Sequence, residues 1–140
     1  MNELNAAIQT RLEGMSIASQ LARVVNGGTF PAIFNQQAPE GQTYPYIVYS
    51  TPSDLDENMT QNRTKNNIVF IRAYSGVSAS QAGSIDAAID TALHLIPLTV
   101  SGWTNFWMVR EQGIELVETQ PTAKIVFMAG AQYRVRLDKS

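Results

Sequence analysis

The chain has 140 residues and a mass of 15.4 kDa, a size that suits one domain able to fold without metal or disulfide. It has no cysteine and one histidine, which excludes thiol catalysis, disulfides and sites built from several histidines. A net charge of −2 argues against a basic phosphate-binding surface, and no apolar run approaches the roughly 20 residues that span a bilayer. We therefore predict one soluble domain over residues 1–140, made in the cytoplasm.

The N-terminal third is predicted to be helical. Leu4, Ile8 and Leu12 recur at helical spacing and predict a helix from about Asn2 to Glu13 that stops near Gly14. A second helix is expected to begin at Ser16 as its N-cap and to run through Val25, because an Asn-Gly-Gly sequence follows.

Two strands are predicted on either side of a polar segment. Residues 45–50 and 68–74 are short, β-branched and aromatic, and apolar at consecutive positions, which indicates strands covered on both faces. Residues 53–67 between them are polar without periodicity, and we predict a long mobile loop there.

A central amphipathic helix is predicted after the second strand. Ser78 or Ser80 serves as its N-cap, Ile85, Ile89 and Leu93 form its apolar stripe, and Pro97 ends it. Asp86 and Asp90 are expected on its other side. The single histidine, His94, is expected to be a solvated or capping group at the helix end.

Three further strands complete the predicted chain. Residues 106–109 and 114–118 are two of them, and the third runs from Lys124 to about Leu137 with a possible bulge at Gly130. The fold class predicted from these elements is α+β: a mainly antiparallel sheet of about four to five strands, with N-terminal helices and one central amphipathic helix packed against it.

The sequence contains no catalytic constellation. One histidine cannot supply a Ser-His-Asp triad or a metal site, and no phosphate-binding loop, dinucleotide fingerprint or zinc motif is present. A pattern like the start of an EF-hand begins at Asp54, but Met59 and Lys65 occupy the positions that need Gly and Glu. We expect no catalytic residue, no cofactor and no metal.

Two groups of residues are candidates for contact with other proteins. The polar segment carries opposite charges at its two ends, and these residues are candidate contacts with other subunits or with a partner protein: Asp54, Asp56, Glu57, Arg63 and Lys65. The candidate aromatic seam consists of Trp103, Phe106 and Trp107, with burial in the core as the alternative. Arg134 and Arg136 share an outward strand face, which is more typical of a solvated face than of a nucleic-acid site.

The order of elements resembles that of the siphophage tail-completion, or tail-terminator, proteins of tailed phages and prophages. The resemblance covers nearly the whole chain as a pattern of elements: the PYIVYS strand, the alternating strand, the helix ending in Leu-His and the closing strand with Tyr-Arg-Val. The matching positions are Pro45, Tyr46, Val48, Tyr49, Ile85, Ala88, Ile89, Leu93, His94, Tyr133, Arg134 and Val135. The WTNFWMVREQG segment departs from the family pattern.

The resemblance implies a structural protein of the virion, not an enzyme. Such proteins form a homo-oligomeric ring, expected here to be a hexamer, on the head-proximal end of the tail tube, where they stop tube growth and join the neck. The implied partners are the protein itself, the tail tube protein and neck or connector proteins. DNA passes through without specific binding, no membrane is involved, and assembly takes place in the host cytoplasm. The alternatives are another head-tail connector or head-closure protein and, from a different class, a small ligand-binding or enzymatic α+β domain.

Overall fold

The computed structural model describes residues 1–21, 31–38, 43–57, 63–119 and 125–139, and the side chains of residues 19, 20, 106, 118 and 119 are not described. Within these residues, two α-helices and a short 3-10 helix combine with six strands. In chain order these are α1 (Asn2–Glu13), η1 (Ser16–Gln20), β1 (Ile33–Asn35), β2 (Tyr46–Glu57), β3 (Thr64–Ser75), α2 (Ala79–Leu93), β4 (Thr99–Val100), β5 (Trp103–Thr119) and β6 (Ile125–Lys139).

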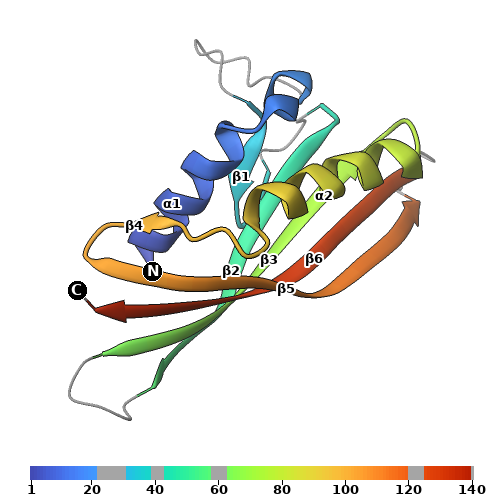
Figure 1. The fold of residues 1–140 in the computed structure, drawn as a ribbon. Coiled ribbons are helices and arrows are strands. Elements are labelled where there is room, and N and C mark those ends of the chain that lie inside the picture. The colour runs from blue at the N-terminus through green and yellow to red at the C-terminus, as the bar shows by residue number, and fades with distance from the viewer. Residues whose placement is uncertain (22–30, 39–42, 58–62, 120–124, 140) are drawn as a thin grey trace.

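The strands form one sheet in the order β1-β2-β3-β6-β5-β4. Every neighbouring pair is antiparallel except β1 and β2, which are parallel. Both α-helices lie on the same face of this curled sheet (Figure 1). The α+β class is confirmed, but the predicted number of about four to five strands was not exact, because the described sheet has six. The strands it lacked, β1 and β4, are three and two residues long, too short to show a hydrophobic period.

The core lies between the two helices and the sheet. Each helix buries one stripe of residues at three- and four-residue spacing. Strands β3 and β6 meet these stripes with alternate residues, while the intervening residues point to the opposite face. The large side chains of this layer that are fully buried are Leu4, Ile8, Leu12, Ile47, Val69, Ile71, Ile89, Leu93, Met108, Tyr133, Val135 and Leu137.

The two helices that were predicted from apolar residues at three- and four-residue spacing are confirmed. Helix α1 has the predicted bounds, and Ser78 caps α2 by accepting a hydrogen bond from the backbone N–H of Gln81 at 3.1 Å. The second N-terminal helix was wrong in its described part, because the chain forms only the 3-10 helix and is extended at Leu21. The rest of that predicted helix lies outside the described residues.

The predicted loop at residues 53–67 was also wrong in its described part. Strand β2 continues to Glu57 and β3 starts at Thr64, and the two pair antiparallel along this stretch. Their polar side chains pair across the strands: Lys65 lies 2.7 Å from Asp54 and 3.1 Å from Asp56. Cross-strand ion pairs and the backbone ladder replace the apolar pattern that the prediction required.

The C-terminal strands differ from their predicted form in two ways. The two strands expected at 106–109 and 114–118 are one 17-residue strand, β5, whose register shifts between Asn105 and Trp107 and between Arg110 and Gln112. Each shift reverses the side-chain alternation, which hides the continuity of the strand in the sequence. Strand β6 pairs with β3 in continuous register through Gly130, so the bulge expected there was wrong.

Candidate assembly surface

The face of the sheet that faces away from α1 and α2, called here the open face, has an apolar half. Cross-strand registers place Val48, Arg72, Gly130 and Ile114 in one row across β2, β3, β6 and β5. The next row contains Tyr46, Tyr74, Met128 and Leu116. Ile114 and Leu116 are 38% and 50% exposed. An apolar sheet face without a covering layer is typical of an interface between proteins.

Aromatic rings extend this apolar half toward the β1 edge. Tyr46 stacks on Tyr44, with ring centroids 5.1 Å apart, and lies 5.2 Å from Tyr74. Phe34 of β1 meets Tyr46 edge-on at 6.2 Å. Large aromatic side chains contribute much of the binding energy at protein interfaces, so this cluster adds to the case for an assembly surface.

The other half of the open face is polar, and its charges are paired. Arg134 contacts the carboxylate of Glu111 at 3.0 Å, and this hydrogen bond lowers the pKa of Glu111. Arg136 contacts Glu57 at 2.6 Å. The two arginines predicted to share an outward face do so, but each is matched by a carboxylate. Such pairing favours a neutral polar surface over a phosphate-binding one.

The adjoining ends of β5 and β6, residues 114–119 and 125–130, pair with each other at one end of the sheet, and we call them the β5–β6 arm. Its exposed apolar side chains are Leu116, Val117 and Ile125, which are 50%, 63% and 50% exposed. Among the described residues, the outer edge of β5 beyond Arg110 makes no backbone hydrogen bond. An exposed apolar strand with a free edge favours contact with another chain.

The five predicted charged contacts do come together, at the far end of the β2–β3 hairpin. Arg63 lies 3.3 Å from Asp56, and Lys65 pairs with both Asp54 and Asp56. The hydrogen bond to Lys65 is the main cause of a lowered pKa for Asp56, and the bond to Asp54 likewise raises the pKa of Lys65. Glu57 instead pairs with Arg136. These ion pairs therefore hold the two strands of the hairpin together at this end. Leu55 is an apolar residue of the same end, and its side chain is exposed.

The predicted aromatic seam does not form one cluster. Trp103 is opposite Lys139 and packs against the core, with the amines of Lys65 and Lys139 at 5.8 and 4.9 Å from its ring. Trp107 is opposite Arg136 on the open face. The register shift between these two tryptophans sends them to opposite faces of β5. The side chain of Phe106 lies outside the described residues.

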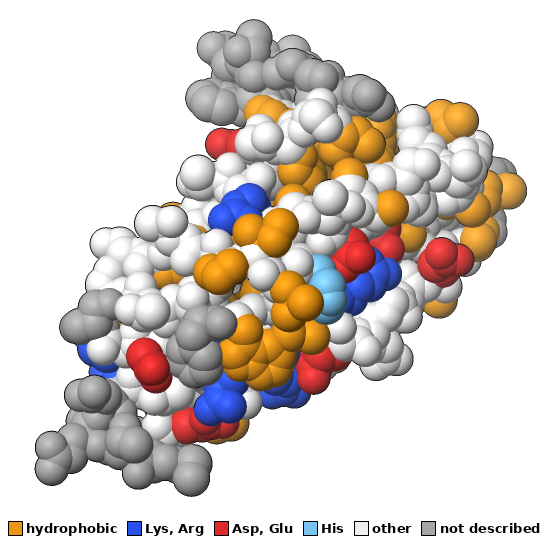
Figure 2. All heavy atoms as spheres, viewed as in Figure 1, with side chains coloured by type: hydrophobic (Ala, Val, Ile, Leu, Met, Phe, Trp, Pro, Cys, Tyr) orange, Lys and Arg blue, Asp and Glu red, His pale blue; other side chains and the backbone are white. Residues whose placement is uncertain are grey.

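A polar cluster joins α2 to the sheet. Asp86 was expected on the outer side of α2, and this was wrong, because its carboxylate is buried 2.8 Å from the guanidinium of Arg110. His94 is the C-cap residue of α2, at the helix end where it was expected, and it accepts a hydrogen bond at Nδ1 from the Arg110 backbone N–H at 3.1 Å, so it also connects α2 to β5. Figure 2 shows the histidine beside acidic and basic side chains on the helix-bearing face. Burial raises the pKa of Tyr133 in the same cluster.

We predict that this cluster acts in stability. Arg110→Gln leaves the Asp86 carboxylate without its cation and is expected to lower the free energy of unfolding by about 1–3 kcal/mol in urea denaturation. The double variant with Asp86→Asn is expected to lose less than the sum of the two single losses. Arg63→Gln, which breaks an exposed pair, is the control and is expected to cost only about 0–1 kcal/mol. Equal losses for Arg110→Gln and Arg63→Gln would contradict this role.

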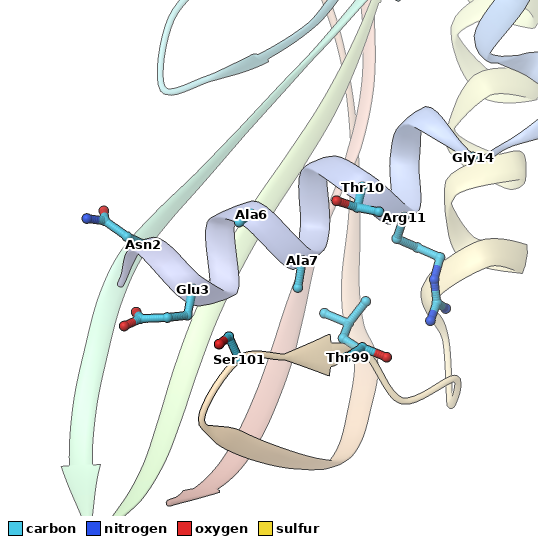
Figure 3. Close-up of a pocket in the computed structure, with 10 residues that line it drawn as sticks. Asn2, Glu3, Ala6, Ala7, Thr10, Arg11, Gly14, Thr99 and Ser101 are labelled. Atoms are coloured by element: carbon cyan, nitrogen blue, oxygen red, sulfur yellow. The ribbon is translucent and has the colours of Figure 1, made fainter.

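A groove of about 720 Å³ runs between α1 and the β4 segment (Figure 3). Its lining includes Ala6, Ala7 and Thr99, and Glu3 and Ser101 lie on its two sides. The guanidinium of Arg11 donates hydrogen bonds to the backbone oxygens of Ala92 and Pro97, both at 2.9 Å, so it ties α1 to the end of α2. The groove therefore shows none of the convergent, perturbed polar groups that chemistry requires.

In the part of the chain that the structure describes, no three His, Asp or Glu side chains are grouped closely enough to hold a metal ion. No helix there is long and apolar enough to cross a membrane.

Comparison with known proteins identifies the family of this chain. A model of the family described as tail completion protein gp17 matches residues 6–128. The chain belongs to this family. It is therefore a structural component of a phage or phage-like tail, as the order of its sequence elements had suggested. A comparison with curated proteins found no match.

Solved structures show the same fold over almost the whole chain. A chain from the virion of a native gene transfer agent (GTA) particle is 17% identical, with a TM-score of 0.73 and coverage of 96% of this chain and 94% of that one. A second solved structure is 14% identical, with a TM-score of 0.56 and the same coverages. At these identities the likeness concerns the fold alone.

The sequence did not reveal the apolar half of the open face as a surface. Tyr46, Tyr74 and Met128 had been assigned to strands, but their common face depends on the registers of separate strand pairs. Strand β3 was expected to be covered on both sides, whereas Phe70, Arg72 and Tyr74 are only half-buried. The signal available was Arg72 itself, a charge inside an otherwise apolar strand.

Proposed function

We propose that this protein is a ring-forming tail terminator. Copies assemble into a closed ring, most simply a hexamer, on the head-proximal end of the tail tube, where the ring stops tube growth and joins the neck. The observation that carries the proposal is the uncovered apolar half of the open face, in a chain that belongs to a tail completion family. A ring subunit needs two different contact surfaces that close by rotation.

The charged end of the β2–β3 hairpin is proposed as a second contact, to the tail tube or to a neighbouring copy. Its charges already pair within the hairpin or, for Glu57, with Arg136 of β6, so it contacts its partner as a rigid element with Leu55 exposed at 55%. We expect Leu55→Asp to weaken binding to tail tubes while the melting temperature of the free subunit stays unchanged. A variant that binds tubes as wild type does would remove the hairpin from the interface.

The ring is proposed to pass DNA without specific binding and to perform no catalysis. The chain has a net charge of −2, and the arginines of the polar half of the open face are paired with carboxylates. Binding of DNA depends on unpaired cations that release counterions, so this surface holds DNA weakly. The ring is assembled in the host cytoplasm and becomes part of the virion.

The test is to mix the purified protein with tail tubes and, separately, with DNA-filled heads, and to examine both by negative-stain microscopy. We expect rings at one end of the tubes and no binding to heads that lack a tail. Binding to heads and not to tubes would overturn the terminator role in favour of a head-closure or connector protein.

A further inference from the structure

Arg72 occupies an unusual place on the open face. It lies at the centre of the apolar half, in the row formed by Val48, Gly130 and Ile114. Its side chain runs against Gly130: a Cβ atom at that glycine would meet Arg72 Cγ at 2.9 Å. The absence of a side chain at position 130 therefore makes room for the arginine to lie along the sheet.

A hollow of about 230 Å³ surrounds this arginine, and we call it the Arg72 hollow. Apart from Arg72, its lining is apolar: Phe70, Ile114, Leu116, Met128, Gly130 and Ala131. The Nε atom of Arg72 is buried and has no hydrogen-bond partner. A buried donor without a partner costs free energy, so a carboxylate placed in the hollow would remove that cost and bind more strongly than it would in water.

Arg72 is also exceptional among the cations. Of the Lys and Arg side chains in the described residues, it is the only one without a hydrogen bond, an ion pair or an aromatic contact. The partners of the others are carboxylates, backbone oxygens or, for Lys139, the ring of Trp103, and these cations are Arg11, Arg63, Lys65, Arg110, Arg134, Arg136 and Lys139.

A matching carboxylate is present on the β5–β6 arm. Glu115 is exposed and makes no hydrogen bond or ion pair within the described residues, and it lies between Ile114 and Leu116 along β5, two residues before the 63% exposed Val117. Its register partner is Ala129, which places Glu115 on the helix-bearing face, opposite the face that holds Arg72. The chain thus carries an unpaired cation in an apolar setting on one side and an unpaired carboxylate in an apolar setting on the other.

We propose that the Arg72 hollow receives the β5–β6 arm of a second copy of this chain, with the Glu115 carboxylate of that copy on the Arg72 guanidinium. Surfaces on opposite sides of one subunit make a head-to-tail contact, which closes into a ring when the rotation between copies allows it. The pair fixes orientation and register, and the apolar side chains around it exclude water. This inference rests on the proposed ring and names the contact that builds it.

Reversing the charges of Arg72 and Glu115 tests their contact directly. The full chain is studied by sedimentation velocity over a concentration series, with tail tubes added as a template for the ring. Arg72→Glu and Glu115→Arg are each expected to lower ring formation roughly tenfold or more, because each places like charges together in a poorly solvated contact. The double variant, Arg72→Glu with Glu115→Arg, is expected to restore assembly to near the wild-type level.

A mismatched double variant is the control. Glu3 is another exposed carboxylate that makes no ion pair with the described residues, but it lies on α1, so Arg72→Glu combined with Glu3→Arg is expected to remain defective. If Arg72→Glu lowers the melting temperature of the subunit, the neutral changes Arg72→Gln and Glu115→Gln replace the reversals. Their double variant is then expected to assemble no worse than either single one.

The outcomes separate this contact from the ring itself. Reversed variants that assemble as well as wild type would overturn the Arg72–Glu115 contact and leave the proposed ring standing. Single variants that fail without rescue by the matched double would also overturn it, since Arg72 would then face another group. A wild-type protein that forms no ring, alone or on tail tubes, would overturn both proposals.

Discussion

Replacing Ile89 with aspartate is expected to unfold most of the protein at room temperature. Ile89 is fully buried on the apolar stripe of α2, between the helix and the sheet. A carboxylate there has no cation partner and must either lose its hydration or take up a proton. Substitutions of this kind cost about 4–5 kcal/mol or more, which is comparable with the whole stability of a small domain, about 5–15 kcal/mol.

The measurement for Ile89→Asp is urea denaturation followed by circular dichroism. Ala87→Asp is the matched control, because Ala87 is exposed on the same helix and its substitution is expected to change stability by no more than about 0.5 kcal/mol. If Ile89→Asp were as stable as this control, α2 would not pack on the sheet through its predicted stripe.

Adding a methyl group at Gly130 is expected to be the second large effect. In strands, alanine normally stabilises relative to glycine, because glycine loses more conformational freedom on folding. At Gly130, however, the new Cβ would lie 2.7 Å from the backbone oxygen of Ile71 and 2.9 Å from Arg72 Cγ. Backbone in the middle of a sheet cannot move without disturbing the β3–β6 pairing, so we expect Gly130→Ala to cost about 1–3 kcal/mol.

Gly83 supplies the control for this experiment. It lies within α2, and a Cβ built there meets nothing within 4 Å. Gly83→Ala is therefore expected to raise the stability by about 0.5–1 kcal/mol, the usual gain for this change in a helix. Thermal unfolding of both variants should move their midpoints in opposite directions. A rise in both midpoints would show that β3 and β6 do not approach each other as closely at Gly130.

The elements that could be predicted from the sequence are those whose signal is local. Helix α1 is marked by the spacing of Leu4, Ile8 and Leu12, and α2 by its apolar stripe and the Ser78 cap. The family resemblance was also correct, because it depends on the order of such elements along the chain.

The elements that could not be predicted depend on partners far away in the sequence. The polar end of the β2–β3 hairpin is held by strand pairing and by the contacts of Lys65 with the two aspartates opposite it. The composition of this segment alone shows none of these contacts, and it therefore suggested a loop. Asp86 had been assigned to solvent because its partner, Arg110, follows 24 residues later.

The candidate surfaces divide in the same way. The charged residues of the hairpin could be named from their local sequence, although their pairing could not. The Arg72 hollow combines residues of β3, β5 and β6, and only the registers of these strands bring them together. The two tryptophans were grouped because they are close along the chain. The register shift in β5 places them on opposite faces of the sheet.

The most direct test of the central claim is a cryo-electron microscopy reconstruction of the protein bound to tail tubes, because it shows both the number of copies and the surfaces between them. We predict a closed ring, most simply of six copies, at one end of the tube, with the apolar half of the open face buried between neighbouring copies. A single copy on each tube, or a ring in which Phe70, Ile114 and Leu116 face solvent, would contradict it.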